Sequence, residues 1–167
     1  MMELAALLCN HAEVQNNRLY VSGGGIDQTD IPVGRRGPWS VSLAIGLSVE
    51  VPWIETDKDH VIHIALVDAD GKPVEVQTNS AVRRPFGVDL RFRIGRPAQL
   101  ETGASQNVAL AVNMPSLPFE ELGSYAFVVS VDDAELRRLP YRLVRQQTMT
   151  VATDGPAGGG RVIPTVS

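Results

Sequence analysis

The chain has 167 residues, of which 44% are hydrophobic and 20% are charged, and its formal net charge is -4. This length suits one domain of ordinary size, and the apolar content is enough for one core. The acidic balance, with a sequence pI near 5.3, excludes a strongly basic nucleic-acid binder. We therefore expect a folded domain that does not bind nucleic acid.

The cysteine content indicates a reducing compartment. With Cys9 as its single cysteine, the chain forms no internal disulfide, and a reducing compartment is the simplest setting. The apolar start of the chain lacks a basic region and is too short for a secretion signal, and no stretch reaches the roughly 18 apolar residues of a membrane span. We expect a cytoplasmic protein that does not bind membranes.

The first predicted elements form a hairpin. Leu4–Val14 and Leu19–Ser22 flank Gln15–Asn17, whose composition is typical of a turn. Three glycines, Gly23–Gly25, follow. Because no helix begins after them and no phosphate-binding motif surrounds them, we interpret them as a bend between strands.

The strongest pattern is a long strand over Trp39–Val51. Apolar residues occupy every second position, small or polar residues lie between them, and Pro52 ends the strand. Trp39 falls on the apolar side, and so does Trp53 if the same register continues past Pro52. This favours packing over a platform for stacking sugars.

Six later segments repeat this alternation or follow it directly: Ile62–Leu66, Val74–Val76, Val88–Ile94, Val108–Met114, Tyr125–Val131 and a last strand near Tyr141–Arg145. Asp68–Gly71 has the chemistry of a hairpin turn. Pro118–Leu122 predicts one helical turn at most, and Pro140 predicts that the last strand lies at a sheet edge.

These segments predict an all-β fold of eight or nine strands. We expect an antiparallel two-sheet sandwich of immunoglobulin-like type, with a closed β-barrel as the alternative. Tyr125, directly before a core strand, is either a tyrosine corner or a tyrosine that only packs.

The domain is expected to span residues 1–152. Residues 153–160 include a glycine-rich run and are predicted to be a flexible linker. Residues 161–167 form a short tail, in which Val162 and Ile163 are β-branched. This tail resembles a strand on a tether.

Catalytic patterns are weak. Cys9 and His11 share a face on a strand, but no neighbouring charge would lower the pKa of the thiol. His60 and His63 lie three apart, so a strand directs them to opposite faces. We expect no enzyme activity, no metal and no cofactor.

Charge is divided between two segments. Five arginines and one aspartate lie between positions 83 and 96, whereas Glu50–Asp70 holds six acids and one lysine. This favours an anion-binding or acidic-partner surface, or a solvated face with internal ion pairs. The candidate binding residues are Arg83, Arg84, Arg91, Arg93 and Arg96, together with Val162 and Ile163 of the tail.

Three motifs, Ala12–Gly25, Leu47–Trp53 and Asp68–Val74, resemble an uncharacterised family of small bacterial proteins that is frequent in actinobacteria. The resemblance extends from about Leu4 to about Arg145. It implies a domain of unknown function with a β-sandwich fold, and its motifs mark turns and strand ends rather than a catalytic site.

We therefore predict a non-enzymatic protein-interaction or structural module, which binds a protein partner or another copy of itself through the strand-like tail. The alternative is a module that binds a sugar or an anion, and an enzyme is the third hypothesis.

Overall fold

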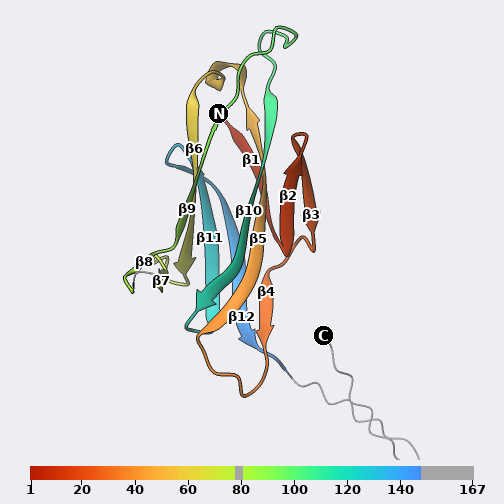
Figure 1. Ribbon diagram of the computed structural model, residues 1–167. Coiled ribbons are helices and arrows are strands. Elements are labelled where there is room, and N and C mark those ends of the chain that lie inside the picture. Colours follow the sequence, from red (N-terminus) through yellow and green to blue (C-terminus); the bar gives the residue numbers. More distant parts are fainter. Residues whose placement is uncertain (78–80, 148–167) are drawn as a thin grey trace, which may run out of the picture.

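The computed structural model describes residues 1–77 and 81–147 (Figure 1). Two larger sheets face each other across one apolar core. The first has the order β1-β5-β10, from β1 (Glu3–Cys9), β5 (Trp39–Val51) and β10 (Gln106–Phe119). The second has the order β4-β12-β11-β6-β9, from β4 (Gln28–Ile31), β12 (Ala134–Arg145), β11 (Gly123–Val131), β6 (Asp59–Asp68) and β9 (Gly87–Arg93).

Two small hairpins complete the described part. One pairs β2 (His11–Gln15) with β3 (Arg18–Ser22), and the other pairs β7 (Glu75–Gln77) with β8 (Arg83–Pro85). A single 3-10 turn, η1 (Trp53–Glu55), follows β5. The pairings are antiparallel except that β4 runs parallel to β12. The all-β sandwich is confirmed, and no sheet of the described residues closes into a barrel.

The predicted alternation of apolar residues determines which side chains of β5 form the core. Odd positions of β5, from Val41 to Val51, are buried against the second sheet. The opposite face of β5 is small, and its centre is also covered, because Leu19 and Val21 of β3 lie where a Cβ on Gly46 would come within 3.1 Å of them. The β2–β3 hairpin is therefore a third layer over the first sheet, and glycine at position 46 allows its close approach.

The turn predictions are confirmed. Asn16 and Asn17 both have positive φ, 49° and 55°, as a two-residue hairpin turn requires. Gly23 and Gly25 also have positive φ, and a Cβ on Gly23 would overlap the Asn10 side chain. The Tyr125 hydroxyl donates to the Glu121 carbonyl at 2.6 Å, which is the bond of a tyrosine corner.

Some boundaries differ from the predictions. The described residues hold twelve strands rather than eight or nine, because Leu4–Val14 divides at Asn10 and short strands such as β4 carry too few residues to show a period. The predicted helical turn at Pro118 is wrong. Pro118 and Phe119 continue β10 opposite β5, beyond a bulge between Met114 and Leu117.

Pro140 predicted that the last strand lies at a sheet edge, and this is also wrong for β12 as a whole. β12 lies inside its sheet, between β4 and β11. However, β4 pairs only with Arg142–Arg145, so Pro140 has a strand on one side alone, opposite Ala126. The missing N–H of proline is tolerated there because no ladder runs along its other side.

Candidate functional site

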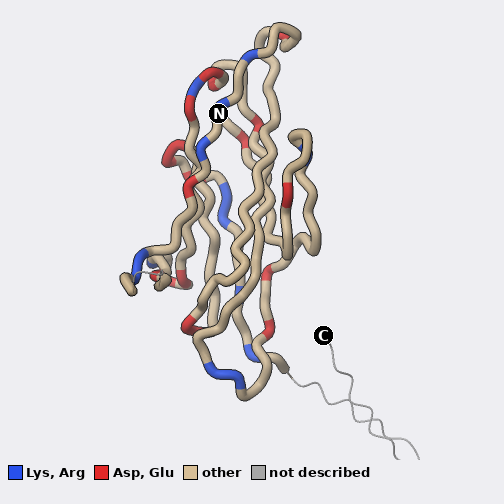
Figure 2. The backbone as a smooth tube through the Cα atoms, viewed as in Figure 1, with Lys and Arg blue, Asp and Glu red and all other residues tan. Residues whose placement is uncertain are grey.

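The structure does not bring the five candidate arginines into one cluster. Arg83 and Arg84 lie on β8, Arg91 and Arg93 on β9, and Arg96 in the loop after β9. Figure 2 shows basic and acidic positions interspersed along this side of the molecule. The segment's positive charge is therefore spread along its length.

Three of these arginines already have partners. Arg83 makes two hydrogen bonds to the Glu120 carboxylate, at 2.8 and 3.0 Å, which raise the pKa of Arg83 and lower that of Glu120. Arg93 lies 3.8 Å from Asp59. Arg96 stacks on the Trp53 ring at 4.7 Å.

Arg96 also fixes the turn before β6. Its guanidinium donates to the Thr56 hydroxyl and to the Trp53 carbonyl, so both the ring and the charge serve packing. Trp39 is buried, with Arg145 over its ring at 5.5 Å. The side chains of Arg84 and Arg91 have no ion pair or hydrogen bond to another described residue.

The two tail candidates, Val162 and Ile163, lie outside the described residues, as do the predicted linker and the rest of the tail.

The possible cysteine–histidine pair is divided between interior and surface. Cys9 is fully buried, and burial raises the pKa of its thiol, although backbone hydrogen bonds to Gly46 and His11 oppose the rise. The His11 ring is 60% exposed and lies 3.9 Å from Glu13. A thiol in this setting is poorly ionised.

His60 and His63 lie on opposite faces of β6, as expected. The His63 ring is exposed and contacts Asp89 at 2.6 Å, whereas His60 is 2% exposed. Within residues 1–77 and 81–147, no group of three or more His, Cys, Asp or Glu side chains has the arrangement of a metal site.

His60 ties three segments together. Its Nδ1 lies 2.7 Å from the Asp132 carboxylate and its Nε2 lies 2.7 Å from the Glu55 carbonyl. Both partners only accept hydrogen bonds, so the protonated ring, with two N–H donors, satisfies both. Burial opposes this charge, but the bonds to Glu55 and Asp132 outweigh it and raise the pKa of His60.

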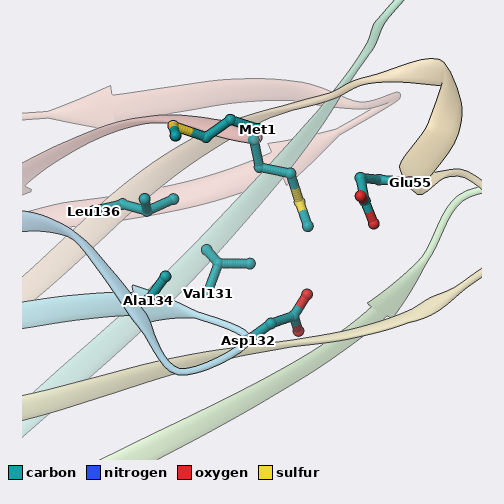
Figure 3. Close-up of a pocket in the computed structure, with 7 residues that line it drawn as sticks. Met1, Glu55, Val131, Asp132, Ala134 and Leu136 are labelled. Carbon is teal, nitrogen blue, oxygen red and sulfur yellow. The ribbon is translucent and has the colours of Figure 1, made fainter.

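Next to this histidine is an open hollow of about 200 Å³. Its lining residues are Met1, Met2, Glu55, Val131, Asp132, Ala134 and Leu136. In Figure 3 the carboxylates of Glu55 and Asp132 lie at one end and Ala134 and Leu136 at the other. Asp132 already accepts from His60 and from the Val61 amide, so it acts in the fold rather than as a free acid.

The sheet edges offer a different kind of site. Four strands end the two sheets: β1, β10, β4 and β9. The carbonyl of Leu8 in β1 accepts from the amides of Gly25 and Ile26. The edge of β10 is bonded by Asn17, whose side chain donates to the Asn107 carbonyl and accepts from the Ala109 amide. β4 has only four residues.

The fourth edge, β9, is open. It contains seven residues and pairs only with β6. Within the part of the chain that the structure describes, no residue bonds to its outer backbone groups. An open edge of this length is a template for another strand.

The orientation of the β9 backbone follows from its neighbour. Both the amide and the carbonyl of Val61 bond to Asp132, on the β11 side of β6. Because the direction of the backbone amides and carbonyls alternates along a strand, the neighbouring even-numbered residues of β6 bond toward β9 instead. These are His60, Ile62 and Ile64, and their partners on β9 are Phe92, Leu90 and Val88, respectively. The amides and carbonyls of the alternate residues, Asp89, Arg91 and Arg93, therefore point outward from the sheet edge.

The side chains of β9 form two rows. Val88, Leu90 and Phe92 face the core but remain half-buried, whereas Asp89, Arg91 and Arg93 are exposed on the outer face. Opposite the apolar row, Val108 and Leu110 of β10 are also half-buried. The sandwich is thus incompletely covered along the β9 side, which in Figure 1 lies opposite the β2–β3 hairpin.

Sequence reasoning found Arg91 and Arg93 but missed the edge to which they belong. Periodicity reports which side chains share a face, whereas strand order depends on contacts between distant segments. It also missed the His60–Asp132 pair, whose members are 72 positions apart. The one available signal on β9 was the alternation of an acid and a base, Asp89 and Arg91, within an apolar strand.

The fold and its edges define a β-sandwich domain in which the outer side of β9 has no backbone partner among the described residues. A model of the family of unknown function DUF6941 matches residues 4–144, so the chain belongs to this family, and the expected resemblance to a domain of unknown function is confirmed. No curated protein matches the chain. Among the described residues, no helix has the length and apolar character needed to cross a membrane.

Proposed function

We propose that this domain is a non-enzymatic protein-interaction module in a cytoplasmic setting, and that its binding surface is the open edge of β9. The observation that carries the proposal is a difference between edges. Other segments bond to the Leu8 carbonyl of β1 and to two backbone groups of β10, whereas the outward amides and carbonyls of Asp89, Arg91 and Arg93 on β9 have no partner among the described residues. An extended partner strand would satisfy these groups and cover the half-buried apolar row.

Two further features support this proposal over an enzyme. The thiol of Cys9 is buried with a raised pKa, and the Asp132 carboxylate is engaged in the fold. The charged groups of β9, in contrast, are exposed around an unpaired backbone. This arrangement suits recognition of a peptide strand more than bond cleavage.

The anion-binding alternative has less support. Arg83, Arg93 and Arg96 have internal partners, and the two remaining candidates, Arg84 and Arg91, lie on different strands. A free anion would meet one arginine at each place rather than a convergent set.

Photo-crosslinking tests the proposal. Benzoylphenylalanine replaces Arg93, at the end of the open edge, or Arg142, which is exposed on the inner strand β12. In the native cells, we expect defined protein adducts from position 93 and none of these from position 142. If both positions give the same background, β9 is not a binding surface and the proposal fails.

A further inference from the structure

The charges of β9 point to a specific occupant of its edge. Asp89 and Arg91 are two positions apart, both have outward backbone groups, and both side chains lie on the exposed face. A second, antiparallel copy of this strand presents the same two residues in reverse order. A strand that carries an acid and a base in this spacing is complementary to itself.

Only certain registers are possible, because outward residues must face outward residues for their amides and carbonyls to bond. Three such registers lie near the centre of the strand. One places Arg91 opposite Arg91 of the second copy, and another places Asp89 opposite Asp89. The first also sets Asp89 opposite Arg93 of the second copy, but its central pair joins two like charges, as does that of the second, and like charges directly opposite each other are destabilising.

The third register is centred on Leu90. It places Asp89 opposite Arg91 of the second copy, and Arg91 opposite its Asp89, so two cross-strand ion pairs form by symmetry. It also uses all seven residues of β9. On the inner face, Leu90 meets Leu90 and Val88 meets Phe92, which covers the half-buried apolar row on both copies.

We infer that the β9 edge takes a second copy of this chain, in the antiparallel register that sets Asp89 against Arg91, and so joins two five-stranded sheets into one continuous sheet. This inference rests on the proposed function and names its partner. The chain's own tail fits less well: it carries no acid to meet Arg91, and Pro164 interrupts its strand-forming residues.

A charge-exchange series on the full chain tests this pairing, with the solution mass measured by light scattering over a range of concentrations. The wild type is expected to form a dimer that dissociates on dilution. Asp89→Arg and Arg91→Asp each turn two attractions into two repulsions and should weaken the dimer at least about tenfold. The double variant D89R/R91D restores opposite charges across the interface and should recover the wild-type dimer.

Two controls accompany the series. Arg84→Asp makes the same change of charge on β8, outside β9, and Val162→Asp with Ile163→Asp changes the tail. Both should leave the dimer intact, and thermal unfolding confirms that each variant is folded. Asp89→Arg also removes the contact with His63, but the double variant lacks it too, so recovery in that variant separates the two effects.

The inference is overturned if the wild type is monomeric at every concentration, if the double variant stays as weak as the single ones, or if only the tail variant lowers the mass. A monomeric wild type that still gives adducts of another protein from position 93 would refute self-pairing and leave the proposed function standing. Absence of both the dimer and the adducts would refute both.

Discussion

At the scale of single residues, His60 links the 3-10 turn, β6 and the β11–β12 turn through hydrogen bonds that only its protonated ring makes in full. Burial tends to raise the pKa of Asp132, but the Val61 amide and His60 lower it overall. The pair thus combines a histidine of raised pKa with an aspartate of lowered pKa. Its effect on stability depends on pH in a defined direction.

We expect this pair to stabilise the fold most between about pH 4 and pH 6.5. The contribution of His60 is complete below the ordinary pKa of histidine and is lost as the pH rises through its raised value. That of Asp132 is complete above the ordinary pKa of aspartate and is lost as the pH falls through its lowered value. His60→Gln should lower the free energy of unfolding at pH 6 by roughly 1–3 kcal/mol.

Urea unfolding at pH 6 and pH 8 measures this effect. The wild type should lose stability between the two values, and His60→Gln should lose clearly less. His63→Gln, at the exposed histidine of the same strand, should behave as the wild type. Equal pH dependence in the wild type and His60→Gln would contradict the assignment.

At the scale of elements, the β2–β3 hairpin is held by side chains that act in place of a strand. The Asn113 amide donates to the Ala12 carbonyl at 2.7 Å and accepts from the Ala12 amide at 3.1 Å. Asn17 makes the matching pair of bonds to β10. Between the hairpin and the first sheet, Ala12 of the hairpin packs with Cys9 and Ala44 in a small buried cluster, so the Cys9 thiol reports whether the hairpin is closed.

Asn113→Ala leaves the backbone groups of buried Ala12 without these partners, which costs about 1–3 kcal/mol. We expect faster labelling of Cys9 by a maleimide in this variant, because the hairpin opens more often. Asn16→Gly, which keeps the left-handed turn and removes no such bond, is the matched control. Equal labelling rates in Asn113→Ala and the wild type would show that these bonds do not hold the hairpin.

The elements also show what the sequence can predict. The thirteen-residue alternation of β5 and the turn at Asn16 and Asn17 are local properties, so the strand and the hairpin were predictable. The small outer face of β5 was visible as well, but nothing local indicates that Leu19 and Val21 cover it. Strand order, the parallel pairing of β4 and the open edge of β9 arise from contacts between distant segments, and periodicity does not encode them.

At the scale of the whole molecule, the account depends on one feature, the edge of β9. The edges of β1 and β10 are bonded in part by other segments of the chain and β4 is short, and the five candidate arginines lie apart on β8, β9 and the loop after β9. The sandwich therefore directs its unpaired backbone and its half-covered apolar row to the same side. The central claim is that association occurs there.

Residue-resolved hydrogen exchange of the full chain, compared between dilute and concentrated solution, tests this claim most directly. The outward amides of Asp89, Arg91 and Arg93 should exchange rapidly in dilute solution and become protected on association. The inward amides of Leu90 and Phe92, already bonded to β6, should change less. If the solution mass rises while the outward amides keep their rapid exchange, the chain associates through another surface, and the account of the β9 edge is wrong.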